Sequence, residues 1–214
     1  MIKDLIVTLQ GTCDMLQHTS ASMNPRNPIL ATIAPIKGRR GKSKTEVVTS
    51  SMEKADWLSS GLWGDLGKTW LEEEDFRWEG YGTPVLPAEY VVCSCQRAGT
   101  AFKSGTKVKQ ALTEGLVSES PIDYDGPKDA VEMWEDRHCR FIDSRSVVVQ
   151  RSRIMRTRLR IPTGWKAKVF LSLDTSIMGL SEFEEILVTA GRRQGVGDFR
   201  PKFGKFSVLS LENA

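Results

Sequence analysis

The sequence has no long hydrophobic run, and this absence excludes a membrane-spanning helix. Of the 214 residues, 40% are hydrophobic and 27% are charged, and no window of about eighteen consecutive apolar residues occurs. The first residues carry Asp4 and no cleavage site, so they lack the pattern of a signal peptide. We therefore expect a globular, cytoplasmic protein with no membrane contact, large enough to bury one core and to carry an inserted subdomain.

Cysteine and histidine are also scarce. The four cysteines are Cys13, Cys93, Cys95 and Cys139, and the two histidines are His18 and His138. Four cysteines are too few for a disulfide scaffold in a chain of this length, so we expect them to stay reduced. No cysteines and histidines are paired at the spacing of a zinc site. His18, in a polar segment after the first expected strand, is kept as a candidate general base, although spacing alone gives it no partner.

Two glycine-containing segments lack the spacing of a nucleotide-binding motif. Gly67-Lys68-Thr69 has Leu62 at the position where a phosphate-binding loop needs its first glycine. The segment with Gly195 and Gly197 has Arg200 where a dinucleotide fingerprint needs its third glycine. We expect no metal and no other cofactor.

Acidic residues are absent from Ser144 to Leu173, although the net charge of the whole chain is only +3. This stretch contains an arginine-rich strand with Arg151, Arg153, Arg156, Arg158 and Arg160. Strand alternation places the last three on one face, opposite a mostly apolar face, and a bulge near Ile154 would be needed to align all five. Unrelieved like charges favour binding of a polyanion. A solvated strand, or pairing with acidic residues elsewhere in the fold, remains the alternative.

Two further basic clusters accompany the arginine-rich strand. One is a glycine-containing loop with Lys37, Arg39, Arg40 and Lys42, and the other, near the C-terminus, contains Arg200 and Lys202. Acidic residues gather in separate blocks. Segregated charge of this kind creates strong local fields at a modest net charge.

Hydrophobic spacing predicts a mixed α+β fold. The expected strands include 2–9, 116–124, 146–150, 154–161, 165–173 and 203–211, and the expected helices include 46–62, 87–102 and 181–193. Ser181 and Glu184 have the spacing of a capping box at the start of the last helix. The C-terminal order is therefore strand, helix, glycine loop, strand, with the last strand paired to one from the N-terminal region.

The segment 191–206, which reads GRRQGVGDFRPKFGKF, resembles the C-terminal glycine-rich loop of the RAMP superfamily, the repeat-associated proteins that bind or cut CRISPR RNA. This resemblance implies a ferredoxin-like (RRM-like) core, in which the loop joins the second helix to the last strand. The whole chain, 1–214, would then be one RAMP-like domain. Residues 13–86 match no standard element of such a core and would form a large insertion or thumb.

The chain also resembles phage-encoded proteins with the same ending. The shared features are Gly11-Thr12 and His18 after the first strand, the helix start Leu86-Pro87-Ala88-Glu89, and the arginine-rich strand. This resemblance implies a phage protein acting in the host cytoplasm. It also implies binding side by side along a strand, and therefore a homo-oligomer or filament.

The leading functional prediction is sequence-independent binding of single-stranded RNA or DNA. Arginine and lysine side chains would hold phosphates, backbone N–H groups of Gly195 and Gly197 would cradle one, and Phe199, Phe203 and Trp165 would stack bases. If the loop cradles phosphate, Gly197→Asn should leave the fold mostly intact and weaken binding. Two alternatives stay open: a metal-independent endoribonuclease that uses His18, and a phage protein that binds an acidic host partner.

Overall fold

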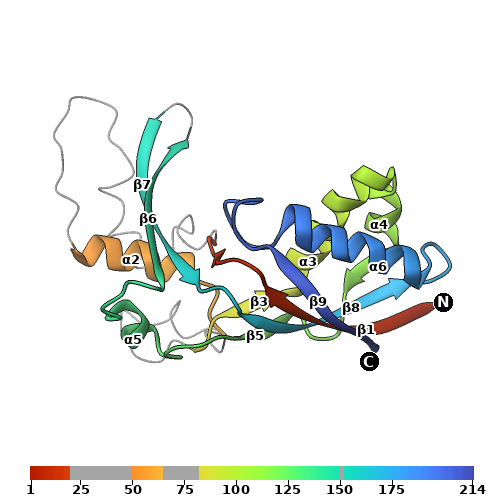
Figure 1. Cartoon of the computed structure of the whole chain (residues 1–214), viewed down its shortest axis with the longest axis horizontal. Coiled ribbons are helices and arrows are strands. Elements are labelled where there is room, and N and C mark those ends of the chain that lie inside the picture. Colours follow the sequence, from red (N-terminus) through yellow and green to blue (C-terminus); the bar gives the residue numbers. More distant parts are fainter. Residues whose placement is uncertain (20–49, 65–81, 150–151) are drawn as a thin grey trace, which may run out of the picture. The chain divides into compact units, whose positions relative to one another are not determined.

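A computed structural model of the chain describes residues 1–19, 50–64, 82–149 and 152–214 (Figure 1). The chain divides into two compact units. Unit 1 comprises Met1–Leu16, Pro84–Gly126 and Ile161–Ala214, and unit 2 comprises Gln17–Thr83 and Pro127–Arg160. The fold class is mixed α+β with antiparallel sheets, as predicted. No helix among the described residues has the length and hydropathy needed to cross a bilayer.

Unit 1 is built on an antiparallel sheet. Its strands are β1 (Ile2–Gly11), β3 (Val85–Pro87), β4 (Leu112–Glu114), β5 (Glu119–Asp123), β8 (Lys166–Asp174) and β9 (Phe206–Asn213). The order across the sheet is β3-β5-β8-β1-β9, and β4 also pairs with β8. The predicted pairing of the last strand with the N-terminal strand is therefore confirmed.

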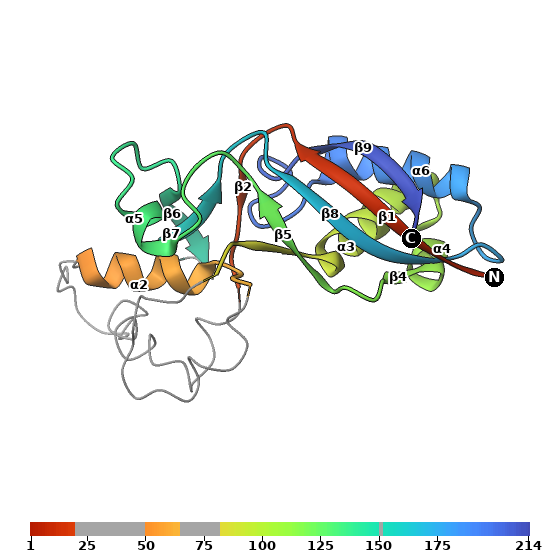
Figure 2. The same ribbon diagram turned by 90° about the horizontal axis from the view of Figure 1, so that it is seen from below.

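Strand alternation determines which face of this sheet is buried. In β1 the side chains of Leu5, Val7 and Leu9 are buried, and in β8 those of Val169 and Leu171 are buried, while the intervening residues are partly exposed. The buried face is covered by α3 (Ala88–Gly99) and α6 (Leu180–Thr189), which lie on one side of the sheet (Figure 2). Two short elements, η4 (Thr100–Phe102) and α4 (Gly105–Ala111), follow α3.

The helix predicted for 181–193 is present, but its two ends differ from the prediction. At the start, the N-cap residue is Gly179, which makes no side-chain cap hydrogen bond, so the predicted capping box of Ser181 and Glu184 is wrong. At the end, the chain continues as a π-helical turn, η5 (Ala190–Gln194), up to Gly195. The apolar stripe is confirmed, because Phe183, Ile186, Leu187 and Ala190 are all buried.

Unit 2 combines the long hairpin of β6 (Ile142–Val149) and β7 (Ser152–Ile161) with α2 (Ser50–Ser60) and α5 (Ala130–Trp134) (Figure 1). Its core is centred on Trp57, whose indole N–H donates to the Phe141 carbonyl at 2.8 Å. The rings of Trp63 and Trp134 each lie 5.5 Å from that of Trp57. Aromatic contacts of this kind add to the stabilisation that burial provides.

On the side of β7 away from β6, two side chains of α2 accept hydrogen bonds from the strand backbone. Asp56 Oδ2 accepts a hydrogen bond from the N–H of Thr157 at 2.7 Å, and Ser60 Oγ accepts one from the N–H of Leu159 at 2.7 Å. These side chains satisfy two N–H groups of β7 that β6 does not pair with. The described part of α2 confirms the helix predicted for 46–62.

Candidate nucleic-acid interface

The glycine loop, Gly195–Lys205, packs against the segment that follows β1 in unit 1. The N–H of Asp198 donates to the Leu16 carbonyl at 2.7 Å, and the N–H of Gly204 donates to the Asp14 carbonyl at 2.8 Å. Within the loop, the N–H of Val196 donates to the Gly204 carbonyl at 2.9 Å. The loop is therefore a folded structure with its own backbone hydrogen bonds.

The glycines of this loop serve close backbone packing. Gly195 and Gly197 have positive φ angles of 72° and 79°, which glycine adopts without a steric penalty. A Cβ added to Gly195 would lie 2.8 Å from the Gly204 carbonyl carbon, and one added to Gly197 would overlap the Leu16 carbonyl oxygen. The space expected for a phosphate at Gly197 is thus filled by protein. The expectation that Gly197→Asn leaves the fold mostly intact is wrong for this steric reason.

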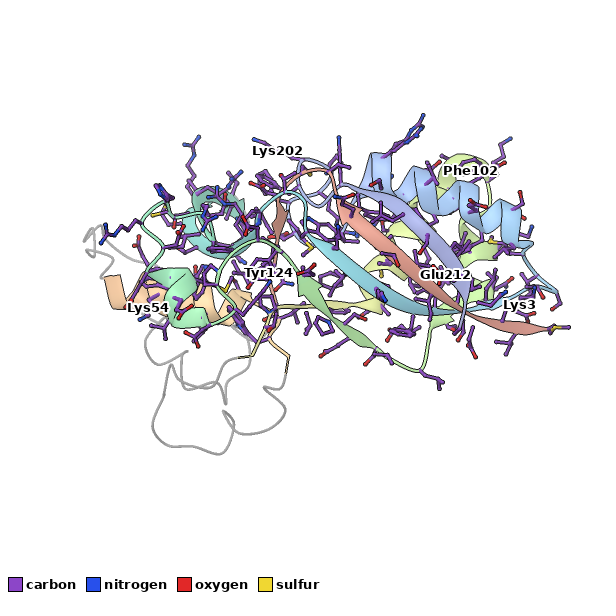
Figure 3. The ribbon with its side chains drawn as sticks, turned by 60° about the horizontal axis from the view of Figure 1, so that its bottom comes forward. Lys3, Lys54, Phe102, Tyr124, Lys202 and Glu212 are labelled. Atoms are coloured by element: carbon purple, nitrogen blue, oxygen red, sulfur yellow. The ribbon has the colours of Figure 1, made fainter. Side chains whose placement is uncertain are left out.

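The tip of the glycine loop exposes aromatic and basic side chains. Phe199 is 41% exposed and has a φ of 55°, a conformation that is uncommon outside glycine. Lys202, labelled in Figure 3, is exposed, with its Nζ 5.8 Å from the centre of the Phe203 ring. The Phe199 and Phe203 rings lie 6.1 Å apart in an edge-to-face arrangement. Trp165, by contrast, is fully buried and donates to the Cys13 carbonyl, so the prediction that it stacks a base is wrong.

One face of α3 lies beside this tip. Tyr90, Cys93 and Arg97 follow the helical spacing i, i+3 and i+7, and each interacts electrostatically with Arg200. We call these four residues the loop–α3 cluster. Burial and then the positive charge of Arg97 lower the pKa of Arg200, while burial raises the pKa of Tyr90.

The two arginines of the loop–α3 cluster have no ion-pair partner in the described part of the chain. Among the residues that the structure describes, no carboxylate lies within ion-pair distance of Arg97 or Arg200. Asp198 is the nearby acid that interacts with Arg200, at longer range. The positive charges of Arg97 and Arg200 repel each other, so an anion bound close to both would be stabilised.

The arginine-rich strand has a different character, because its arginines occupy separate environments. β6 and β7 pair without a register shift, so no bulge occurs near Ile154, and Arg153 faces away from Arg156 and Arg158. Arg158 is only 4% exposed and lies opposite Asp143, which is itself buried. The Arg145 Nε donates to Asp143 Oδ1 at 2.6 Å. Arg158 is therefore buried, whereas the sequence prediction placed it with Arg156 and Arg160 on one face that binds a polyanion.

Arg156 and Arg160 have partners within unit 2. The Arg156 guanidinium contacts His18 Nε2, and that of Arg160 donates to the carbonyls of Arg140 and Cys139 at 2.6 and 2.7 Å. His18 is positioned by its neighbour Gln17, whose N–H donates to the Leu159 carbonyl at 3.0 Å. Arg160 thus caps a turn, whereas Arg156 and His18 form a pair at the surface of the hairpin.

Five predicted contacts lie outside the described residues: Arg151, Lys37, Arg39, Arg40 and Lys42. Sequence reasoning missed Tyr90 and Arg97, although their helical spacing put them on one side of a predicted helix. The sequence does not show which loop lies against the side of α3 that carries Tyr90 and Arg97. Within the described residues, no group of three His, Cys, Asp or Glu side chains could hold a metal ion.

No protein-family profile matches the chain, and no curated protein matches its sequence.

Proposed function

We propose that this chain binds single-stranded nucleic acid without sequence preference, and that unit 1 carries a ferredoxin-like (RRM-like) core of the RAMP type. The order of elements supports the fold proposal. In sequence, β1, α3, β5, β8, α6 and β9 run βαββαβ, and across the sheet the corresponding order is β5-β8-β1-β9. That arrangement, with the second and fourth strands at the two edges of the core, is typical of ferredoxin-like domains.

The observation that carries the functional proposal is the combination of Phe199 with Arg97 and Arg200. An exposed aromatic ring can stack on any base, because every base has a π face. Two arginines with no ion-pair partner among the described residues can hold the adjacent phosphate, and phosphate contacts carry no sequence information. Arg200 is half-buried, so its interaction with a phosphate is less screened by water than that of a fully exposed cation.

Exposed cations near the loop extend this surface. Lys202 at the tip, and Arg192 and Arg193 on η5, are exposed. The glycine backbone contributes by shaping the loop. In this proposal the side chains at the tip, rather than the N–H groups of Gly195 and Gly197, contact the nucleic acid. We further propose that the protein is phage-encoded, acts in the host cytoplasm, and assembles side by side along the strand.

Fluorescence anisotropy with labelled single-stranded RNA, single-stranded DNA and duplex DNA tests this function. We expect single strands of mixed sequence to bind with similar affinity, and duplex to bind more weakly because its bases are not available for stacking. Phe199→Leu should weaken binding by about 1–3 kcal/mol. Arg200→Gln should reduce the slope of log affinity against log salt concentration by about one. Lys109→Gln, at an exposed position of α4, is the matched control. Failure of every nucleic acid to bind would reject the proposal and favour an acidic protein partner.

The pair of His18 and Arg156 favours a second candidate, a metal-independent endoribonuclease. Arginine only donates hydrogen bonds, so a hydrogen bond in this contact requires the form of His18 whose Nε2 accepts, and in that form the ring would be a base beside a cation. His18 would take the proton of a 2′-hydroxyl as its oxygen attacks the phosphorus. Arg156 would stabilise the charge on phosphate oxygens, and the departing 5′-oxygen would take a proton from water.

Incubation with labelled single-stranded RNA tests this second candidate. Cleavage products with 2′,3′-cyclic ends, lost in His18→Ala and absent for a deoxy substrate, would support it. Intact RNA after long incubation would reject it without affecting the binding proposal.

A further inference from the structure

Unit 1 has a groove of about 420 Å³ along the outward face of α6. Its lining includes Ser181, Glu184, Glu185 and Val188, which follow the spacing i, i+3, i+4 and i+7 and therefore lie on one side of the helix. Phe102 of η4 lies beside them and is 43% exposed (Figure 3). The groove thus presents two carboxylates next to an exposed aromatic ring.

The carboxylates of the groove have no partner within the described chain. Glu182, on the next side of α6, pairs with Lys107, but neither Glu184 nor Glu185 has an ion pair in the described residues. Stabilisation of the helix N-terminus by acidic residues is confined to the first turn, and these two side chains lie beyond it. Helix stability also gives no reason for the exposure of Phe102. The chemistry of the groove fits a segment that carries a cation beside apolar side chains.

The distal end of the β6–β7 hairpin has that chemistry. Val148 pairs with Arg153, and Ser146 pairs with Met155, so the four side chains share one face of the hairpin. Val148 is 68% exposed and Met155 is 49% exposed. Arg153 is exposed and has no ion pair among the described residues. We call this face the hairpin patch.

We propose that the groove on α6 binds the hairpin patch of a second copy of this chain. Arg153 would lie between the carboxylates of Glu184 and Glu185, while Val148 and Met155 would cover Phe102 and Val188. The two surfaces match in charge and in apolar character. Because they are different surfaces, the contact is heterologous, and a pair of copies keeps one free groove and one free patch. Copies therefore add head to tail, into a ring or an open filament.

This inference rests on the self-assembly part of the proposed function and is independent of nucleic-acid binding. It is tested on the full-length protein after nuclease treatment, with the mass measured by light scattering over a range of protein concentrations at low salt. We expect the wild-type mass to rise with concentration beyond that of a dimer. The groove variant, Glu184→Lys with Glu185→Lys, and the patch variant, Arg153→Glu, should each keep the monomer mass. The control Glu114→Lys reverses another exposed acid and should assemble like wild type.

Mixing the variants makes the test specific for this contact. In a one-to-one mixture, the intact groove of the patch variant meets the intact patch of the groove variant, and the altered groove meets the altered patch with the charges exchanged, so the mixture should assemble beyond two copies although each variant alone stays monomeric. A chain that carries all three substitutions has its charges exchanged and should recover assembly. A wild-type protein that stays monomeric, or a groove variant that assembles like wild type, would overturn the inference. Binding of a short single-stranded oligonucleotide should be the same in the groove variant and wild type, which separates this outcome from failure of the proposed function.

Discussion

Gly197 packs directly against the carbonyl of Leu16, at a place where no side chain fits. A Cβ at this position would overlap the Leu16 oxygen, which already accepts the Asp198 N–H at 2.7 Å. The glycine loop and the segment after β1 are therefore held together through their backbones. This contact fixes the position from which Phe199 and Arg200 are presented.

The first prediction compares Gly197→Ala with Gly164→Ala. Both glycines have positive φ, 79° and 92°, but an added Cβ at Gly164 meets no atom within 4 Å. Gly164→Ala should therefore cost only the backbone strain, about 1–2 kcal/mol. Gly197→Ala adds a steric overlap and should cost about 1–3 kcal/mol more. Urea denaturation followed by circular dichroism measures both, and equal losses would show that the Leu16 contact can relax.

The second prediction separates the arginines of β7. Arg158 is 4% exposed and lies opposite the buried Asp143, so Arg158→Ala should lower the free energy of unfolding by about 3 kcal/mol through lost packing and an altered charge balance around that carboxylate. Arg153 is exposed, so Arg153→Ala should change it by less than about 0.5 kcal/mol. If Arg158→Ala and Arg153→Ala have the same free energy of unfolding in thermal and urea experiments, Arg158 is not part of the unit 2 core.

The strand and helix order of unit 1 could be predicted from the sequence, because its signals are local. Alternation identified β1 and β8, and helical spacing identified α3 and α6. The capping box was wrong since a short-range pattern does not show where the chain enters the helix. The last strand begins at Phe206 rather than at 203 because the preceding residues pack on Asp14 and Leu16, which are distant in sequence.

The third prediction concerns acid stability. Hydrogen bonds from the side chain and the N–H of Ser176 lower the pKa of Asp174 from 3.8 to about 2. Because the folded state binds the proton less tightly than the unfolded state, this carboxylate stabilises the fold above pH 4. That stabilisation is lost as the pH falls from 4 to 2. The wild-type unfolding free energy should fall more steeply over this range than that of Asp174→Asn. Parallel curves would show that the hydrogen bonds do not persist in solution.

The candidate site was less predictable than the fold, because its members come from separate parts of the chain. Arg200 could be named from the basic ending, but its neighbours Tyr90 and Arg97 depend on how α3 packs against η5. For the arginine-rich strand, the residues could be named from the sequence but their environments could not. Its charge pattern was visible in the sequence, whereas the burial of Arg158 and the turn contacts of Arg160 arise from tertiary packing that charge patterning does not encode.

The fourth prediction uses the repulsion between Arg97 and Arg200. Their like charges interact unfavourably, and neither has an ion-pair partner in the described residues. Arg97→Glu should convert this repulsion into attraction and raise the free energy of unfolding by up to about 1 kcal/mol, seen as a slightly higher melting temperature. High salt should remove this gain in stability. The same substitution places a carboxylate where we propose that a phosphate binds. Affinity for single-stranded nucleic acid should then fall by about tenfold or more at low salt.

Arg97→Gln tests the same point without reversing the charge. It should give a smaller gain in stability and reduce the slope of log affinity against log salt by about one. A gain in stability combined with a loss of binding is characteristic of residues kept for function at the expense of stability. Titrations at several salt concentrations, together with thermal melts of the same samples, measure both quantities. An Arg97→Glu protein that binds like wild type would exclude the loop–α3 cluster from the interface, because a carboxylate beside a bound phosphate must weaken it.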